Sequence, residues 1–145
     1  MASLLGGFCL ANAGLGAVHG IAAALGARFE MPHGLACACT LAATVEVNVR
    51  VLETRAPSSP ALGRYARIGE ALCGRAFATE AEARAAAVKD VRALCEELRV
   101  PKLSGYGVTE AKLAMLVGES RGSSMKSNPI ALEDPEIEEI LRASL

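Results

Sequence analysis

The chain has 145 residues, of which 52% are hydrophobic and 21% charged, and its 15 basic and 16 acidic residues leave a net charge of -1. This length suits a single domain, and the composition excludes disorder over most of the chain. The balanced charge gives no electrostatic reason to expect nucleic acid or an anionic membrane as a partner. Because aromatic residues make up only 3%, we expect a core of closely packed helices with small aliphatic side chains.

Residues 1–27 contain no Asp, Glu, Lys or Arg, and their length would allow a membrane span. The segment is dominated by Gly and Ala and contains Asn12 and His19, so a buried core helix is the favoured interpretation. A small membrane protein anchored by this segment is a less favoured alternative. The first predicted helix covers residues 3–25, bent around Gly14 and Gly16, with Gly26 as its C-terminal cap.

The second predicted helix begins near His33 and runs to about Leu52, with apolar residues at a helical period. A break follows at residues 56–60, where two prolines interrupt the pattern. A third helix is expected over residues 61–73.

A fourth helix is expected to begin near Thr79, where Thr79 and Glu82 form a capping-box pattern, and to end before Pro101. A fifth follows Thr109, and a short last helix starts near residues 134–135. No period-two strand pattern of useful length is present. The sequence therefore predicts an all-α helical bundle formed by one domain, residues 1–145.

The five cysteines show no CxxC pair, and we see no secretory signal with a basic n-region. Reduced thiols in a cytoplasmic protein are the simplest interpretation. A zinc site built from Cys37 and Cys39 is a weaker alternative, because structural zinc usually takes C-x2-4-C spacing and four ligands.

The two histidines of the chain flank the same predicted turn. His19 lies late in the first helix and His33 at the start of the second, so a reversal would bring both imidazoles to one point. Neutral imidazole is a common ligand for Fe(II) and Zn(II). The alternative is that each is a satisfied core or cap residue, and two histidines do not complete a metal site.

The local sequence around these histidines is distinctive. The run NAGLGAVHGIA (residues 12–22), followed by LG (25–26) and PHG (32–34), closely resembles the signature of iron-containing (group III) alcohol dehydrogenases. Asn48 resembles the Asn that often closes the next helix of that family. Further segments are supportive: LACACTL (35–41), RYARI (64–68), LRVPKL (98–103), GV (107–108) and NP (128–129).

The resemblance implies the C-terminal helical, metal-binding domain of the dehydroquinate synthase-like / iron-containing alcohol dehydrogenase fold, without its N-terminal nucleotide-binding domain. His19 and His33 match two of the family's metal ligands, and its other two, an Asp and a His, would lie upstream. Fe(II) or Zn(II) is the implied metal, and NAD(P) is implied only with the missing domain. No glycine-rich phosphate loop after a strand is visible here.

Two positions depart from the family pattern. Ala23 stands where many members carry a further His near the nicotinamide, so proton handling there is not carried over. Ala42 follows Leu41 where the family often has Pro, which predicts a straighter second helix.

The implied function is that of a partial metal-dependent alcohol dehydrogenase, an NAD(P)-linked alcohol/aldehyde oxidoreductase, inactive by itself. A maleylacetate reductase-type fragment and a non-catalytic helical interaction or oligomerisation module are the alternatives. Because the mean hydropathy is high at +0.31, we expect an exposed apolar face. The expected partners are a second copy of the chain or a separate N-terminal domain chain, with no nucleic acid and no membrane.

Overall fold

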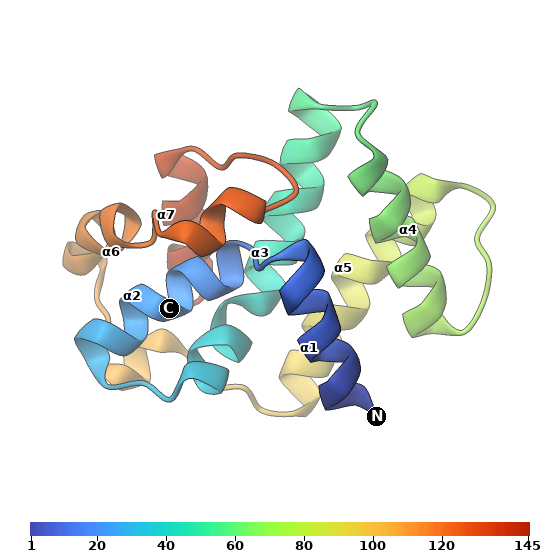
Figure 1. Ribbon diagram of the computed structural model, residues 1–145. Helices are drawn as coiled ribbons and strands as arrows, with labels where there is room; N and C mark the ends of the chain where they lie inside the picture. Colours follow the sequence, from blue (N-terminus) through green and yellow to red (C-terminus); the bar gives the residue numbers. More distant parts are fainter.

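The computed structural model describes the backbone of residues 1–145 and the side chains of all of them except Ala2, Ser3 and Cys9. Every regular element it describes is a helix, which confirms the predicted all-α class (Figure 1). In chain order these are α1 (Ala2–Ala13), α2 (Ala17–Phe29), α3 (His33–Arg55), α4 (Pro60–Cys73), α5 (Glu80–Glu97), η1 (Leu103–Tyr106), η2 (Glu110–Lys112), α6 (Leu113–Glu119), η3 (Ser123–Ser127) and α7 (Asp134–Ala143).

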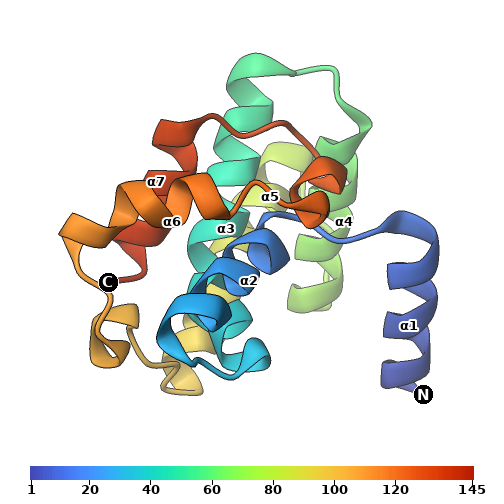
Figure 2. The ribbon, with the colours of Figure 1, turned by 60° about the vertical axis from the view of Figure 1, so that its left-hand side comes forward.

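The long helix α3 lies at the centre of the domain and is contacted by α2, α4, α5 and α7 (Figures 1 and 2). Its inward face follows the helical period through Ala36, Ala43, Val47 and Val51, all buried. These small side chains let α2 and α7 approach closely, and the two helices contribute larger apolar residues to the same core. The larger residues are Ile21, Leu25, Ile137, Ile140 and Leu141. Full burial of one such side chain contributes about 1.5–3 kcal/mol.

Helices α4 and α5 form a tightly packed pair beside α3. They contact each other closely at Gly69, where a Cβ atom would lie 1.9 Å from the carbonyl oxygen of Ala83. The predicted cap at Thr79 is confirmed, since its hydroxyl accepts a hydrogen bond from Glu82 N at 3.2 Å. The Glu82 carboxylate in turn accepts from Ala78 N, one residue before the cap.

The prediction of one bent helix over residues 3–25 is wrong, because the helix is interrupted. The structure has two helices there, α1 and α2, whose axes differ by 101°. Gly14 adopts a φ of +72°, which favours glycine, and an added Cβ would lie 2.6 Å from Ser127 Oγ. Gly16 is extended and precedes the first residue of α2. As a result α1 extends away from the rest of the domain (Figure 2).

Two predicted helix ends also differ from the structure. Helix α2 continues through Gly26 to Phe29, and Glu30 ends it in the left-handed conformation with φ 50°. Helix α3 continues to Arg55, so Asn48 does not close it but lies buried within it. The reversal is therefore made after Phe29, at residues 30–32, and Pro32 immediately precedes α3.

Helix α3 is long and apolar enough, by length and composition, to cross a bilayer, as is the bent pair α1–α2 if it is counted as one span. Half of the most apolar part of α3 is buried within the domain. A central core helix shows the same pattern.

Candidate metal centre

His19 lies in the first turn of α2, close to the break that separates this helix from α1. Gly16 O accepts hydrogen bonds from the backbone N–H groups of both His19 and Gly20. The N–H of Ala17, which has no partner within the helix, donates to Asn128 Oδ1 at 3.0 Å. A residue distant in sequence therefore defines where α2 begins, and with it the position of the imidazole.

His33 is the first residue of α3, immediately after Pro32. Cys37 follows one helical turn later and therefore lies on the same face of the helix. Its sulfur is 3.6 Å from His33 Nε2. The helix thus presents an imidazole and a thiol side by side toward the start of α2.

The structure brings the two predicted site residues together. The ring centroids of His19 and His33 are 5.2 Å apart, with an angle of 47° between the ring planes. One ligand atom from each of His19, His33 and Cys37 lies within 4.8 Å of the others. The predicted helical reversal therefore places both imidazoles at one point, with a thiol that the sequence interpretation had not assigned to them.

The spacing and chemistry of these donors fit a divalent transition metal. In a tetrahedral site, ligand atoms ~2.1 Å (nitrogen) and ~2.3 Å (sulfur) from the ion are about 3.6 Å from each other. The contact between His33 Nε2 and Cys37 Sγ already has this length, 3.6 Å. The remaining donor, on His19, lies within 4.8 Å of the other two.

Local electrostatics favour the uncharged, ligand form of His19. Its side chain is half-buried, and this burial lowers its pKa, with a smaller contribution from the neighbouring His33. Burial raises the pKa of the Cys37 thiol. The cluster thus contains a neutral imidazole and a protonated thiol, and a metal that binds the sulfur must displace its proton.

A groove of about 520 Å³ opens beside His19, between the start of α2, the middle of α3 and the loop after η3. Its walls combine apolar side chains such as Leu41 and Val45 with the polar groups of Asn48 and Tyr65. Tyr65 is held uncharged, because burial raises its pKa. The groove offers space for a small, largely apolar molecule next to the imidazole.

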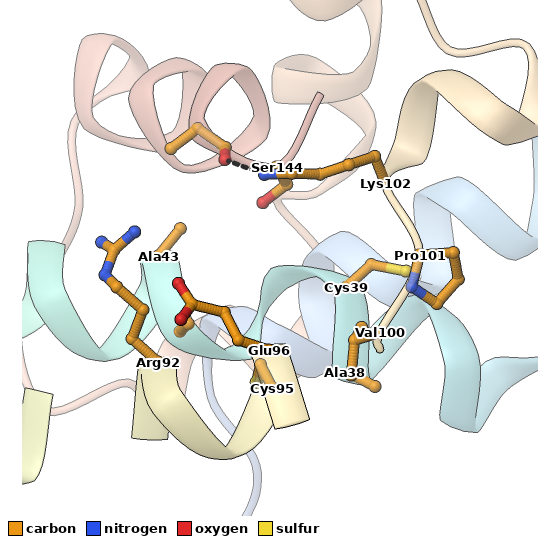
Figure 3. A pocket seen from close by; sticks show the side chains of 12 residues that line it. Ala38, Cys39, Ala43, Arg92, Cys95, Glu96, Val100, Pro101, Lys102 and Ser144 are labelled. Carbon is orange, nitrogen blue, oxygen red and sulfur yellow. Dashed lines mark hydrogen bonds between the residues drawn. The ribbon is translucent and has the colours of Figure 1, made fainter. Parts of the chain in front are cut away.

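Cys39 does not share the site of Cys37, although only one residue separates them. It lines a smaller pocket of about 150 Å³ with Cys95, Glu96 and Lys102 (Figure 3). Lys102 Nζ there donates to the carbonyl oxygen of Ala143, near the end of α7. Residues two apart on a helix point in nearly opposite directions, so the structure does not support a zinc site built from Cys37 and Cys39.

The fold and the paired imidazoles define a helical domain with a candidate metal centre. Residues 1–145 match the family model described as the Fe-containing alcohol dehydrogenase family, C-terminal. The chain belongs to this family, as its sequence resemblance predicted.

Two named relatives show what the chain is similar to. It is 32% identical over 152 aligned positions to the 1-propanol dehydrogenase PduQ of Salmonella typhimurium, covering 99% of this chain and 39% of that protein. A 70-residue stretch is 43% identical to the 1-propanol dehydrogenase PduQ of Citrobacter freundii, covering 48% of this chain and 17% of that one. The chain therefore spans about two fifths of the length of the Salmonella relative, at 39%.

Solved structures agree with this assignment. A 1,3-propanediol oxidoreductase superposes with a TM-score of 0.84 at 29% identity, over 99% of this chain and 36% of that chain. An alcohol dehydrogenase from Oenococcus oeni gives a TM-score of 0.77 at 25% identity, over 99% and 36%. The helical fold predicted from the sequence is that of this family's C-terminal domain.

Proposed function

We propose that the chain is the metal-binding helical part of an NAD(P)-linked alcohol/aldehyde oxidoreductase, with His19 and His33 as ligands of Fe(II) or Zn(II). The observation that carries the proposal is the approach of the two imidazoles, whose centroids are 5.2 Å apart. Relatives named for 1-propanol and 1,3-propanediol support short primary alcohols, or the corresponding aldehydes, as the substrate class.

A metal held at these residues supplies Lewis-acid chemistry that favours loss of the hydroxyl proton of an alcohol. The chain's own residues do the positioning. His19 faces the groove, so a small alcohol in the groove has its hydroxyl end near the imidazoles and its alkyl end beside Leu41 and Val45. Those apolar walls limit the access of water to the reacting end.

The described helices do not fit a dinucleotide site by themselves. They contain no strand leading into a glycine-rich loop, and Gly14 and Gly16 face Ser127 and Asn128 instead. NAD(P) binding therefore belongs to another domain in this proposal, either in the same longer protein or in a separate chain. We expect residues 1–145 alone to show no robust dehydrogenase activity.

One observation favours a second candidate function, that of a non-catalytic interaction or oligomerisation module. The described large side chains of α1, and that of Met1 before it, are more than half exposed: Met1, Leu4, Leu5, Phe8 and Leu10. Such an apolar helix surface is typical of a face that packs against another domain or a second copy. The free thiols of Cys37, Cys39, Cys73 and Cys95 are consistent with a reducing cytoplasm for either candidate.

A chimaeric enzyme tests the catalytic proposal. This chain would replace the C-terminal segment of the Salmonella 1-propanol dehydrogenase that it matches, and reduction of propanal by NADH would be measured together with metal content. We expect the chimaera to turn over propanal and to contain metal. His19→Ala and His33→Ala should abolish both turnover and bound metal, while Cys39→Ser, on the same helix as His33, should leave turnover and metal content unchanged. A folded chimaera that lacks turnover of any substrate would favour the non-catalytic module. Turnover of maleylacetate but not of propanal would indicate a maleylacetate reductase-type activity.

A further inference from the structure

We propose that Cys37 is a third protein ligand of the metal, so that His19, His33 and Cys37 together form a two-histidine, one-thiolate site within this chain. The inference rests on the proposed metal-binding role of the two histidines and adds a residue that the family resemblance does not include.

The first support is the rigid placement of the sulfur. Cys37 follows His33 by one turn of α3, and the intervening Ala36 and the following Thr40 are fully buried in the core. This turn is packed on its inner face, so the backbone that carries Cys37 Sγ and His33 Nε2, which lie 3.6 Å apart, belongs to a fixed helix and not to a loop. This Sγ–Nε2 distance equals the separation expected for a nitrogen and a sulfur ligand on one tetrahedral ion, about 3.6 Å.

The second support is that no other described interaction engages the thiol. Cys37 is a free, half-buried cysteine, and its one polar contact among the described side chains is the His33 ring. Its sulfur lies with both imidazoles inside a cluster 4.8 Å across. Cys39, the nearest thiol in sequence, lines a different pocket.

Coordination by the thiol has a defined chemical balance. The S–H bond of Cys37 breaks, its proton leaves to the buffer, and the electron pair on sulfur forms the bond to the divalent ion, with no change of oxidation state. One proton is released for each ion bound. Within this chain alone, three protein ligands leave one tetrahedral position for water or for a ligand from another domain, and a thiolate shifts the preference toward zinc or cobalt and away from magnesium.

Cobalt(II) titration of the 145-residue chain tests this directly, because a cobalt–thiolate bond gives a charge-transfer band in the near ultraviolet that imidazole ligands do not give. The protein would be kept reduced with a phosphine and titrated without oxygen. We expect the charge-transfer band together with the visible ligand-field bands of cobalt. We also expect release of about one proton per ion in weakly buffered solution.

The variants separate the thiol from the histidines. Cys37→Ser should lose the charge-transfer band and weaken cobalt binding by about tenfold or more, since even outer neighbours of ligands cost that much. Cys39→Ser should keep both band and affinity, and thermal unfolding without metal should show that both variants fold. His19→Ala and His33→Ala should lose tight binding.

The outcomes that differ from these expectations would overturn one or both proposals. If Cys37→Ser keeps the band or the wild-type affinity while the histidine variants lose binding, the two-histidine site stands and the thiolate ligand is disproved. If the histidine variants bind cobalt as the wild type does, the proposed metal site and the thiolate ligand are both disproved. If the wild type binds none, the three-ligand site within this chain is disproved, and the metal content of the chimaera decides whether His19 and His33 bind metal in a larger enzyme.

Discussion

Asn48 and Asn128 exchange hydrogen bonds through their side-chain amides, although 80 residues separate them in sequence. Asn128 Nδ2 donates to Asn48 Oδ1 at 2.8 Å and also to the carbonyl oxygen of Ile130 at 2.8 Å. Asn128 Oδ1 accepts from the N–H of Ala17. The pair thus connects the middle of α3, the start of α2 and the loop after η3 beside the groove that His19 also lines.

Replacement of Asn128 by Ala should therefore destabilise the domain. The buried Asn48 amide and the Ala17 N–H would both lose their partner, and an unsatisfied buried polar group costs about 1–3 kcal/mol. Urea denaturation followed by circular dichroism measures the free energy of unfolding. The control is Asn12→Ala, because Asn12 is exposed and donates to Phe8 O within α1, which predicts a change within about 0.5 kcal/mol. Equal effects of the two substitutions would contradict the role given to Asn128.

Helix α4 should not tolerate a side chain at Gly69. An added Cβ would lie 1.9 Å from Ala83 O, so Gly69→Ala must push α4 and α5 apart, at a cost of about 1–3 kcal/mol or more. Gly63 lies in the same helix, and there the Cβ would meet only the Glu80 carboxylate at 3.6 Å. Gly63→Ala should be neutral or stabilise by up to about 1 kcal/mol, because Ala favours the helix. Thermal unfolding of both variants checks the contrast, and similar melting temperatures would refute it.

The ion pair between Arg28 and Glu119 should make a pH-dependent contribution to stability. The hydrogen bond from Arg28 lowers the pKa of Glu119 below its ordinary 4.5. The folded state therefore binds this proton less tightly than the unfolded state does. The pair stabilises the fold above pH 4.5, and this contribution disappears as the pH falls through the lowered pKa of the folded state.

The melting-temperature difference between the wild type and Arg28→Gln, measured from neutral to strongly acidic pH, checks this sign. We expect a small difference at neutral pH that vanishes in acid and shrinks in high salt, because both side chains are partly exposed. In a Glu119→Gln background the same substitution should have no effect. A difference that stays constant with pH would show that Arg28 acts through packing instead.

The exposed face of α1 should promote self-association of residues 1–145. Phe8 is 58% exposed and Leu5 54% exposed on a helix that extends away from the domain. Removal of such apolar side chains from water favours contact between copies. Light scattering at several concentrations should show a mass that rises with concentration and falls toward the monomer in Leu5→Glu/Phe8→Glu. Leu98→Glu, at a side chain 67% exposed near the end of α5, should not change the mass.

Much of the local structure could be predicted because it depends on neighbours in sequence. The apolar period of α3, the cap at Thr79 and the start of the last helix near Asp134 involve hydrogen bonds and side chains within one or two turns. The reversal between His19 and His33 belongs to the same class, because the left-handed Glu30 and the following Pro32 make the turn within the three residues that join the two helices. Cys37 could have been found by the same logic, because it stands four residues after His33.

Only the tertiary structure decided which segments distant in sequence contact each other. The break between α1 and α2 depends on Ser127 and Asn128 facing Gly14 and Gly16, and the burial of Asn48 depends on the same loop. No periodicity or spacing encodes these contacts, because their free energy arises only when residues far apart in sequence are packed together. The sequence alone thus determined a helical domain with two converging imidazoles, and packing across the chain decided which groups surround them.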